Sequence, residues 1–272
     1  MIRIVSMLIL CAATVHAASP SMWMMARRAR MATAPTAWTP SNAVVRLWFD
    51  AADMSTLQCS NTVSVTNWLD KSGSGYNAQQ MTIDSRPTIS TNLLNGKNVV
   101  YFSYDEYLLR TIDTTLLKNL SNAVIFCVIK PNIVPSASTP FSIQAGAGNA
   151  RVYMQWTTTN ILQVGGRRLD ADSYQSISIT NAAVKEWSMV VTVIDYVNSN
   201  LQVRINGTAY DRPGGFQTPG LSQNGDSSTF GVGGSYAQTA FIYGWIAEIG
   251  VIYGKDDVAN IETYLRAKWG TP

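Results

Sequence analysis

"GWIAEIGVIYGKDDVANIETYLRAKWG", residues 244–270, joins an apolar stretch of strand length directly to a short amphipathic segment at the end of the chain. Its first part alternates with a period of two, as in a strand whose successive side chains point to opposite faces of a sheet. We expect one face to carry Ile246, Glu248, Gly250 and Ile252, and the other to carry Trp245, Ala247, Ile249 and Val251. The pattern predicts a final strand that leads straight into a helix.

The helix is predicted from its ends and its apolar stripe. Asp256 or Asp257 can cap its N-terminus, where negative charge is favoured. The stripe has helical spacing and consists of Val258, Ile261 and Leu265, with Tyr264 beside them. Gly270 is a typical residue to end a helix. A strand followed by such a helix packs the chain end onto a sheet, which stabilises the fold and indicates almost nothing about function.

The rest of the region 38–272 consists of short strand-like runs separated by turn residues, the pattern of a β-sandwich or barrel. In the region 187–212 two alternating runs form the clearest hairpin, and Asn206-Gly207 supplies a tight turn into a third strand. Pro131 is expected to end the apolar run before it, because proline cannot donate to a ladder. The expected strands lie at 43–51, 63–68, 97–109, 122–130, 150–156, 160–169, 187–195, 200–205, 227–236 and 240–254.

Four stretches carry a resemblance to a known family. They are "LWFDAADMSTL" (47–57), "VTNWLDKSGSGYNAQQ" with "RPTISTNLLNGKNVVYF" (65–80 and 86–102), "EWSMVVTVIDYVNSNLQVRINGT" (186–208) and the closing stretch. Together they resemble the laminin-G-like, concanavalin A-like jelly-roll domains of bacterial secreted proteins and phage virion proteins. The resemblance implies an all-β, two-sheet antiparallel jelly-roll sandwich with a short C-terminal helix, over residues 38–272. It implies little about activity, because the fold hosts lectins, glycosidases, adhesion modules and capsid decorations.

The N-terminus permits two interpretations. Residues 1–18 have a positive Arg3, an apolar core and the small residues Val15 and Ala17 at the −3 and −1 positions of a cleavage site, as in a signal peptide. Alternatively the protein starts at Met31, and the leader is an N-terminal extension. The apolar run is too short to span a bilayer comfortably. Residues 19–37 are expected to form a flexible Ala/Thr/Pro linker.

Composition excludes several kinds of function. The net charge is only +3, and no basic stripe interleaved with aromatic residues indicates nucleic-acid binding. The single histidine, His16, lies in the leader, which excludes Ser-His triads, Cys-His dyads and histidine-ligated zinc from the folded region. Cys59 and Cys127 either form a disulfide in an exported protein or stay as free thiols, and the sequence leaves both alternatives open.

We expect no enzymatic activity. Retaining glycosidases need two carboxyl groups about 5 Å apart, and the signature Glu-x-Asp-x-x-Glu that the resemblance implies for such enzymes is absent. Glu248 has no carboxylate two or four residues away along its strand. We expect it to bond to a neighbouring strand or to lie exposed on the outer face. The other glutamates, Glu106, Glu186 and Glu262, are not placed as a pair on one face of a strand.

Carbohydrate binding is the ligand chemistry that the resemblance favours. The segment "GGRRLDADSYQS" (165–176) gathers basic, acidic and aromatic residues where a strand passes into a loop, and its alternative interpretation is a solvated loop without a ligand. The candidate residues are Trp156, Arg167, Arg168, Asp170, Asp172, Tyr174 and Tyr236. Asp170, Asp172 and Asp195 could contribute to a calcium site, but no run matches a dedicated calcium loop, and we expect no cofactor.

These observations predict a non-enzymatic surface protein. The first hypothesis is a phage virion decoration or attachment protein with a possible glycan-binding domain, located on the virion surface. Its partners would be other virion or surface proteins, glycans and further copies of itself, but neither nucleic acid nor a membrane. The alternative is a secreted bacterial carbohydrate-binding or adhesion protein. The mature N-terminus distinguishes the two.

Overall fold

The computed structural model describes residues 37–133, 137–145, 149–158, 160–182, 185–212, 215–223, 228–235 and 239–272. The expected leader 1–18 and all of the expected linker except Ala37 lie outside the described residues. Residues Trp38–Pro272 form one compact unit. In the described part of the chain, no helix combines the length and the apolar character needed to cross a membrane.

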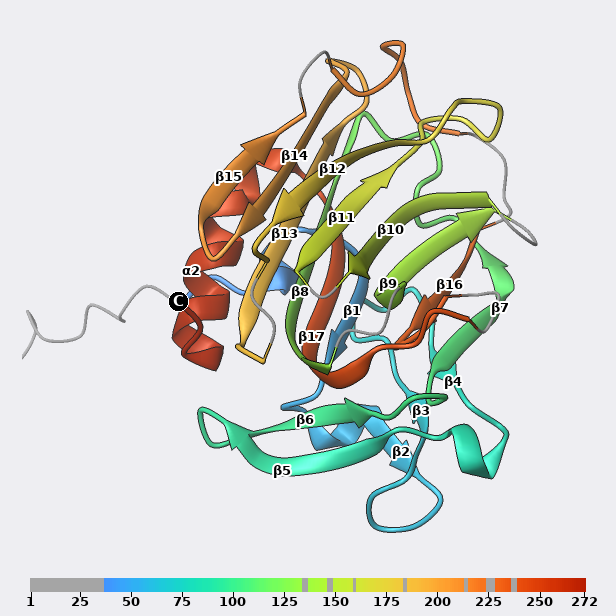
Figure 1. Cartoon of the computed structure of the whole chain (residues 1–272), viewed down its shortest axis with the longest axis vertical. Coiled ribbons are helices and arrows are strands. Elements are labelled where there is room, and N and C mark those ends of the chain that lie inside the picture. Colours follow the sequence, from blue (N-terminus) through green and yellow to red (C-terminus); the bar gives the residue numbers. More distant parts are fainter. Residues whose placement is uncertain are drawn as a thin grey trace, which may run out of the picture. The chain divides into compact units, whose positions relative to one another are not determined.

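The unit is a jelly-roll sandwich of two antiparallel sheets, which confirms the predicted fold class (Figure 1). The first sheet has eight strands in the order β15-β14-β13-β8-β17-β6-β5, and β1 also pairs with β17. Strand β8 pairs along almost the whole of one edge of β17. Strands β6 and β1 therefore share the other edge of β17. The second sheet has nine strands in the order β12-β11-β10-β9-β16-β7-β4-β3-β2.

The strands of the first sheet are β1 (Val44–Asp50), β5 (Thr88–Leu94), β6 (Lys97–Phe102), β8 (Asn122–Ile133), β13 (Ser188–Asp195), β14 (Asn200–Ile205), β15 (Thr208–Asp211) and β17 (Tyr243–Tyr253). Those of the second are β2 (Leu57–Cys59), β3 (Val65–Trp68), β4 (Ala78–Gln79), β7 (Leu108–Thr114), β9 (Ser138–Ala145), β10 (Asn149–Thr158), β11 (Ile161–Gly166), β12 (Gln175–Thr180) and β16 (Ser228–Val232). The short 3-10 turns are η1 (Pro40–Asn42), η2 (Met54–Thr56), η3 (Ile83–Ser85) and η4 (Lys255–Asp257). The closing helix is α2 (Val258–Trp269).

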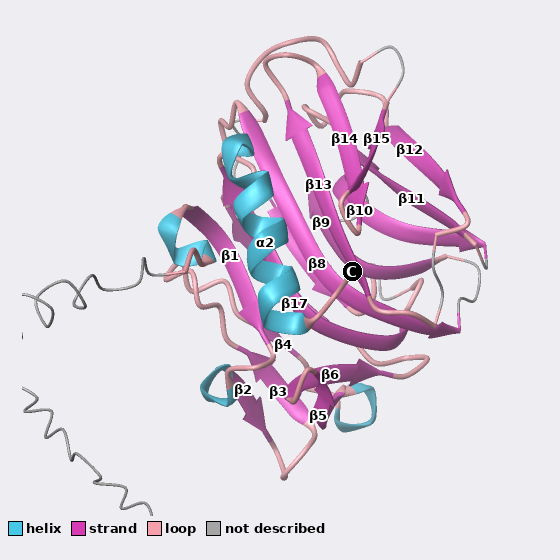
Figure 2. Ribbon diagram, turned by 90° about the vertical axis from the view of Figure 1, so that its left-hand side faces the viewer, coloured by secondary structure: helices cyan, strands magenta, loops and turns pink. Residues whose placement is uncertain are grey.

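The apolar residues form two layers. One fills the space between the sheets and includes Trp68, Phe141 and Trp156. The other lies between the outer face of the first sheet and α2, which runs along that face (Figure 2). Strand β8 contributes to both layers, which explains why its sequence is apolar without alternation. Helix α2 contributes Ile261 and Leu265, two residues of its predicted apolar stripe, to the layer between itself and the first sheet.

The alternation predicted for the final strand is wrong at its centre. The register of β17 against β8 shifts between Ile246 and Glu248, as expected of a β-bulge. Trp245 and Ala247 pack with the outer layer, whereas Ile246 and Ile249 belong to the core between the sheets. The extra residue at the bulge shifts the alternation of side chains by one position. Glu248 therefore lies on the outer face next to Ala247, beneath α2.

Three other local predictions are wrong. Run 97–109 is two strands, because the backbone turns after β6 and the Glu106 carboxylate accepts a hydrogen bond from the Ser103 N–H. Strand β8 continues past Pro131, where its register against β17 is irregular and a ladder bond can be missing. Asp257 does not cap α2 through its side chain, because its backbone is already helical and continues from η4.

The two cysteines in the described residues are free, so the disulfide alternative is not realised. Cys127 is fully buried between the sheets, and Cys59 packs partly buried against the same core. Gly270 ends α2 as predicted, in the left-handed conformation with a φ of 67° and with its N–H donated to the Arg266 carbonyl.

Candidate functional site

The charged side chains of the predicted loop between β11 and β12 contact other groups of the protein. Arg167 donates to the Asp170 carbonyl at 3.0 Å, and Arg168 donates to the Leu221 carbonyl at 3.1 Å. The Asp172 carboxylate accepts from the Leu169 N–H and lies 3.8 Å from Arg168. The structure therefore brings these four predicted residues together, but it turns their polar groups toward the protein.

Asp170 has a definite structural partner in β10. Its two carboxylate oxygens accept from the Arg151 guanidinium at 3.0 and 3.1 Å, in a bidentate ion pair. The Arg151 side chain is 2% exposed, whereas that of Asp170 is 36% exposed. The loop thus neutralises a buried cation at the end of the sandwich, a role that the sequence did not reveal.

The predicted aromatic residues separate. Trp156 is 1% exposed and packs between the two sheets, so it presents no ring to a ligand. The prediction that Trp156 forms a binding platform is therefore wrong. Tyr174 stacks on Tyr153 with ring centroids 4.4 Å apart. Tyr236 lies outside the described residues. Of the predicted set, Tyr174 is the residue that leads to the site described next.

A polar hollow of about 170 Å³ lies on the outer face of the second sheet. It is lined by Thr139, Ser142, Gln144, Tyr153, Gln155 and Ser235. Most of these side chains come from β9 and β10, which lie side by side (Figure 1). Ser142 and Gln144 alternate with the core residues Phe141 and Ile143, so the pleat directs them outward.

Two buried oxygen atoms that line this hollow, and a third beside it, have no hydrogen-bond partner in the described chain. Ser142 Oγ and Gln144 Oε1 belong to lining residues that are 1% and 7% exposed, whereas Thr229, which carries the third atom, Oγ1, is 3% exposed and does not line the hollow. Thr229 pairs with Gln144 across β16 and β9, so the two side chains are neighbours on one face. A buried polar atom without a partner costs about 1–3 kcal/mol. Such a group indicates that water or a ligand supplies the missing bond.

A larger hollow of about 270 Å³ lies beside Trp48 and Lys71 on the other sheet. Its polar side chains already have partners within the protein. Ser41 bonds to Thr39, Ser72 bonds to Asp70, and Trp48 Nε1 donates to Glu248. No unsatisfied side-chain atom among its described lining residues awaits a ligand, so this hollow is the weaker candidate.

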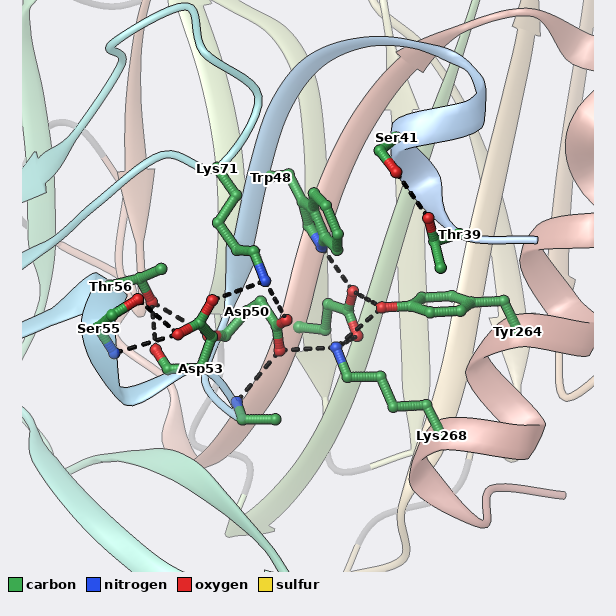
Figure 3. A network of polar contacts seen from close by, with 12 residues as sticks. Thr39, Ser41, Trp48, Asp50, Asp53, Ser55, Thr56, Lys71, Tyr264 and Lys268 are labelled. Atoms are coloured by element: carbon green, nitrogen blue, oxygen red, sulfur yellow. Dashed lines mark hydrogen bonds and ion pairs between the residues drawn. The ribbon is translucent and has the colours of Figure 1, made fainter. Parts of the chain in front are cut away.

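A carboxylate pair exists that the sequence did not predict. Asp50 of β1 and Glu248 of β17 are cross-strand partners, so both lie on the outer face of the first sheet. The Lys268 ammonium bridges them, at 2.6 Å from Asp50 and 2.8 Å from Glu248. Figure 3 shows Lys268 and Tyr264 reaching from α2 toward Asp50 and Trp48, with Lys71 on the far side of Asp50.

Glu248 is fully buried and accepts hydrogen bonds from four groups. These are Trp48 Nε1, Tyr264 OH, Lys268 Nζ and Trp269 Nε1. Burial raises the pKa of this carboxyl, while the Lys268 ammonium opposes the increase. The expectation that Glu248 is exposed or bonded to a neighbouring strand is therefore corrected in part. Trp48 does come from a neighbouring strand, but the other three donors come from α2, and the pair fastens the helix to the sheet.

Metal binding finds no support in the described chain. No group of three or more His, Cys, Asp or Glu side chains is placed to hold an ion there. Asp195, a calcium candidate, bonds to Asn198 and to Lys255 Nζ at 2.6 Å. Asp170 and Asp172, the other two candidates, are engaged by arginines.

The residues of the polar hollow escaped prediction although a signal was present. Residues 150–156 alternate, and the alternation that places Met154 and Trp156 inside places Tyr153 and Gln155 outside. Choosing Trp156 as the platform selected the wrong member of this alternating set. The contribution of β9 and β16 depends on strand order, which no local pattern contains.

Neither a protein-family model nor a curated protein matches this sequence. Among solved structures, the chain is similar to the binding domain of botulinum neurotoxin serotype D, with a TM-score of 0.56 and 13% identity over 87% of this chain and 56% of that one. It is also similar to the receptor binding domain of botulinum neurotoxin type G, with a TM-score of 0.53 and 12% identity over 84% of this chain and 54% of that one. The chain spans about half the length of these structures. At such identity, the similarity establishes the fold alone.

Proposed function

We propose that this chain is the non-enzymatic binding domain of a surface protein and that it binds carbohydrate in the polar hollow. The observation that carries the proposal is that Ser142 Oγ and Gln144 Oε1 line the hollow together with Tyr153 and are buried without partners, with the unpartnered Thr229 beside Gln144. Sugars present hydroxyl groups that both donate and accept, and C–H faces that pack on aromatic rings. That chemistry matches the lining of the hollow.

The strands make the hollow a rigid site. Ser142 pairs with Tyr153 across β9 and β10, and Gln155 donates to the Thr139 hydroxyl at 3.2 Å. Tyr153 is also fixed by its stacking on Tyr174. Side chains that are already held in place lose little conformational entropy on binding, which raises affinity. The fold similarity to toxin binding domains is compatible with a binding role.

Absence of catalysis is part of the proposal. Glu248 is fully buried under α2, and Asp50 is 4% exposed, so neither carboxyl is open to a substrate. Among the described residues that line the polar hollow, none carries a carboxyl group or an imidazole. A glycosidase needs an acid and a second carboxylate at the scissile bond, and these residues supply neither.

The first test removes the aromatic ring of the hollow. We expect Tyr153→Ala to weaken binding to an array of neutral and acidic oligosaccharides at least about tenfold, since truncating an aromatic side chain central to a binding site costs about 2 kcal/mol or more. Surface plasmon resonance on the best ligand of the array gives the dissociation constant. Thermal unfolding of the same variant verifies that the domain remains folded.

Tyr104→Ala is the matched control. Tyr104 follows β6 of the other sheet, is 56% exposed and stacks on Tyr243 at 4.7 Å. The substitution therefore removes an equally large ring from a stacked pair that belongs to the other sheet and does not line the hollow. Equal losses in both variants, or a loss confined to Tyr104→Ala, would contradict the assignment of the hollow.

We propose further that the domain is displayed on a phage particle, as a decoration or attachment protein together with other virion proteins or copies of itself. The resemblance of its four sequence stretches to such domains supports this proposal. The alternative remains an exported bacterial adhesion or carbohydrate-binding protein. We expect the intact mass of the native protein to correspond to a start at Met1 or Met31. A mature start at Ala18 would contradict the virion proposal and favour export.

A further inference from the structure

We infer that the polar hollow selects uncharged sugars over sugars that carry a carboxylate or sulfate. The inference rests on the proposed function, because it specifies the ligand class of the same site. It follows from the absence of charge in the described lining and from the kind of hydrogen bond that the unpartnered atoms require.

The described lining of the hollow is electrically neutral. It consists of hydroxyl groups, two amides and one phenol. The phenol stays protonated, because burial raises the pKa of Tyr153 to about 12. An anionic sugar entering this hollow would lose hydration at its charged group without gaining a counter-charge, which opposes binding.

Cations nearby in the chain are already engaged. Arg151 lies in β10, two residues before Tyr153, but both Asp170 oxygens hold its guanidinium. Arg167 and Arg168 in the neighbouring loop bond through Nη1 to the Asp170 and Leu221 carbonyls, and Arg168 Nε, which makes no hydrogen bond within the described residues, lies 3.8 Å from the Asp172 carboxylate. Recruiting one of them for an anionic ligand would require breaking contacts that the fold already uses.

Gln144 gives a second reason for the hollow to prefer uncharged sugars over anionic ones. Its Oε1 is an acceptor and is satisfied only by a donor. A sugar hydroxyl or an N-acetyl N–H can donate to it, whereas an ionised carboxylate or a sulfate ester can only accept. An anionic group placed against Gln144 Oε1 would leave that oxygen unpartnered, and it could pair with this side chain only if the amide turned to present Nε2, whereas a hydroxyl pairs with either orientation. Ser142 and Thr229 accept either kind of partner, because a hydroxyl both donates and accepts.

Matched glycosides test the inference on the full chain. The probes are the methyl glycosides of glucose, galactose and mannose and their uronate counterparts, which differ only in a CH₂OH or a carboxylate at C6. Ligand-observed NMR titration measures each affinity. We expect the best neutral glycoside to bind at least about tenfold more tightly than its own uronate, as expected when a buried acceptor loses its donor.

A pair of glutamine variants tests whether Gln144 is responsible for the preference for uncharged sugars. Gln144→Met removes the acceptor at nearly constant volume and should weaken neutral binding about tenfold. Gln202→Met is the control. Gln202 lies in β14 of the other sheet, donates to the Asp211 carboxylate at 2.8 Å and does not line the hollow. Its substitution should leave the affinity unchanged.

The outcomes separate the two proposals. A uronate that binds as tightly as its neutral counterpart, or more tightly, overturns the inference and leaves carbohydrate binding intact. Equal effects of Gln144→Met and Gln202→Met also overturn it. If no glycoside of either class binds and the oligosaccharide array stays empty, the proposed function itself is wrong.

Discussion

Replacing Lys268 by methionine should lower the free energy of unfolding by about 3–5 kcal/mol, the range for removing one partner of a buried ion pair. Lys268 is the ammonium that bridges Asp50 and Glu248 under α2, and its side chain is 12% exposed. Without it Glu248 would be fully buried beside Asp50 with no cation of its own, whereas Asp50 keeps Lys71 at 2.9 Å. Denaturant unfolding measures the loss.

The double variant Lys268→Met, Glu248→Gln is the control for this prediction. The amide removes the uncompensated charge and can still accept from Trp48 or Trp269. It should recover more than half of the loss, because removing both members of a buried pair costs much less than removing one. A double variant no more stable than Lys268→Met would mean that the lysine acts through packing and not through charge.

The single variant Lys268→Met should also show a characteristic pH dependence of its stability. Burial raises the pKa of Glu248, and Lys268 opposes this effect, so its removal raises the folded-state pKa further above that of the unfolded chain. Between those two pKa values the folded variant binds more protons than the unfolded one, so its stability falls as the pH rises through that window. Its deficit relative to the unsubstituted chain should therefore narrow as the pH falls from about 7 toward about 4. A deficit independent of pH would contradict a charge effect.

The second large effect is expected at the loop between β11 and β12. Asp170→Asn should destabilise the domain by about 3 kcal/mol, because it removes the carboxylate that holds the buried Arg151 guanidinium in a bidentate ion pair. The value lies at the lower end of the range for buried pairs, since Asp170 is 36% exposed and water can reach part of the vacated site. Calorimetric and denaturant unfolding of the variant give the change.

Asp172→Asn is the matched control in the same loop. Asp172 lies 3.8 Å from Arg168, and both side chains are partly exposed, so we expect a loss of about 0–1 kcal/mol. Glycan affinity of the folded Asp170→Asn variant should be unchanged, because the carboxylate faces Arg151. A loss of affinity without a loss of stability would show instead that the loop itself binds the ligand, as its composition suggested.

Local patterns in the sequence predicted most of the fold. The turn Asn206-Gly207, with φ values of 52° and 88°, and the hairpin of β13 and β14 lie where the sequence placed them. These features depend on neighbours along the chain. The bulge in β17 was not predictable in this way, because a single inserted residue leaves no mark on a run that is apolar on both sides.

Contacts between distant residues explain what the sequence missed. Asp50 and Glu248 meet because β1 pairs with β17, and a search for carboxylates along one strand cannot find such a pair. The polar hollow likewise requires β9 and β10 to be neighbours and Ser235, which follows β16, to lie beside them. The loop 165–176 attracted attention by its composition, but Asp170 was already committed to Arg151 in another strand.

The position of a bound sugar tests the central claim most directly. Backbone amide NMR spectra of the full chain, recorded with the neutral methyl glycoside that binds best, should shift at Ser142, Gln144, Tyr153 and Thr229 and stay unchanged at Tyr104. Shifts confined to Tyr104 and its surroundings, or to the loop 165–176, with β9 and β10 unaffected, would contradict the assignment of the polar hollow as the carbohydrate site.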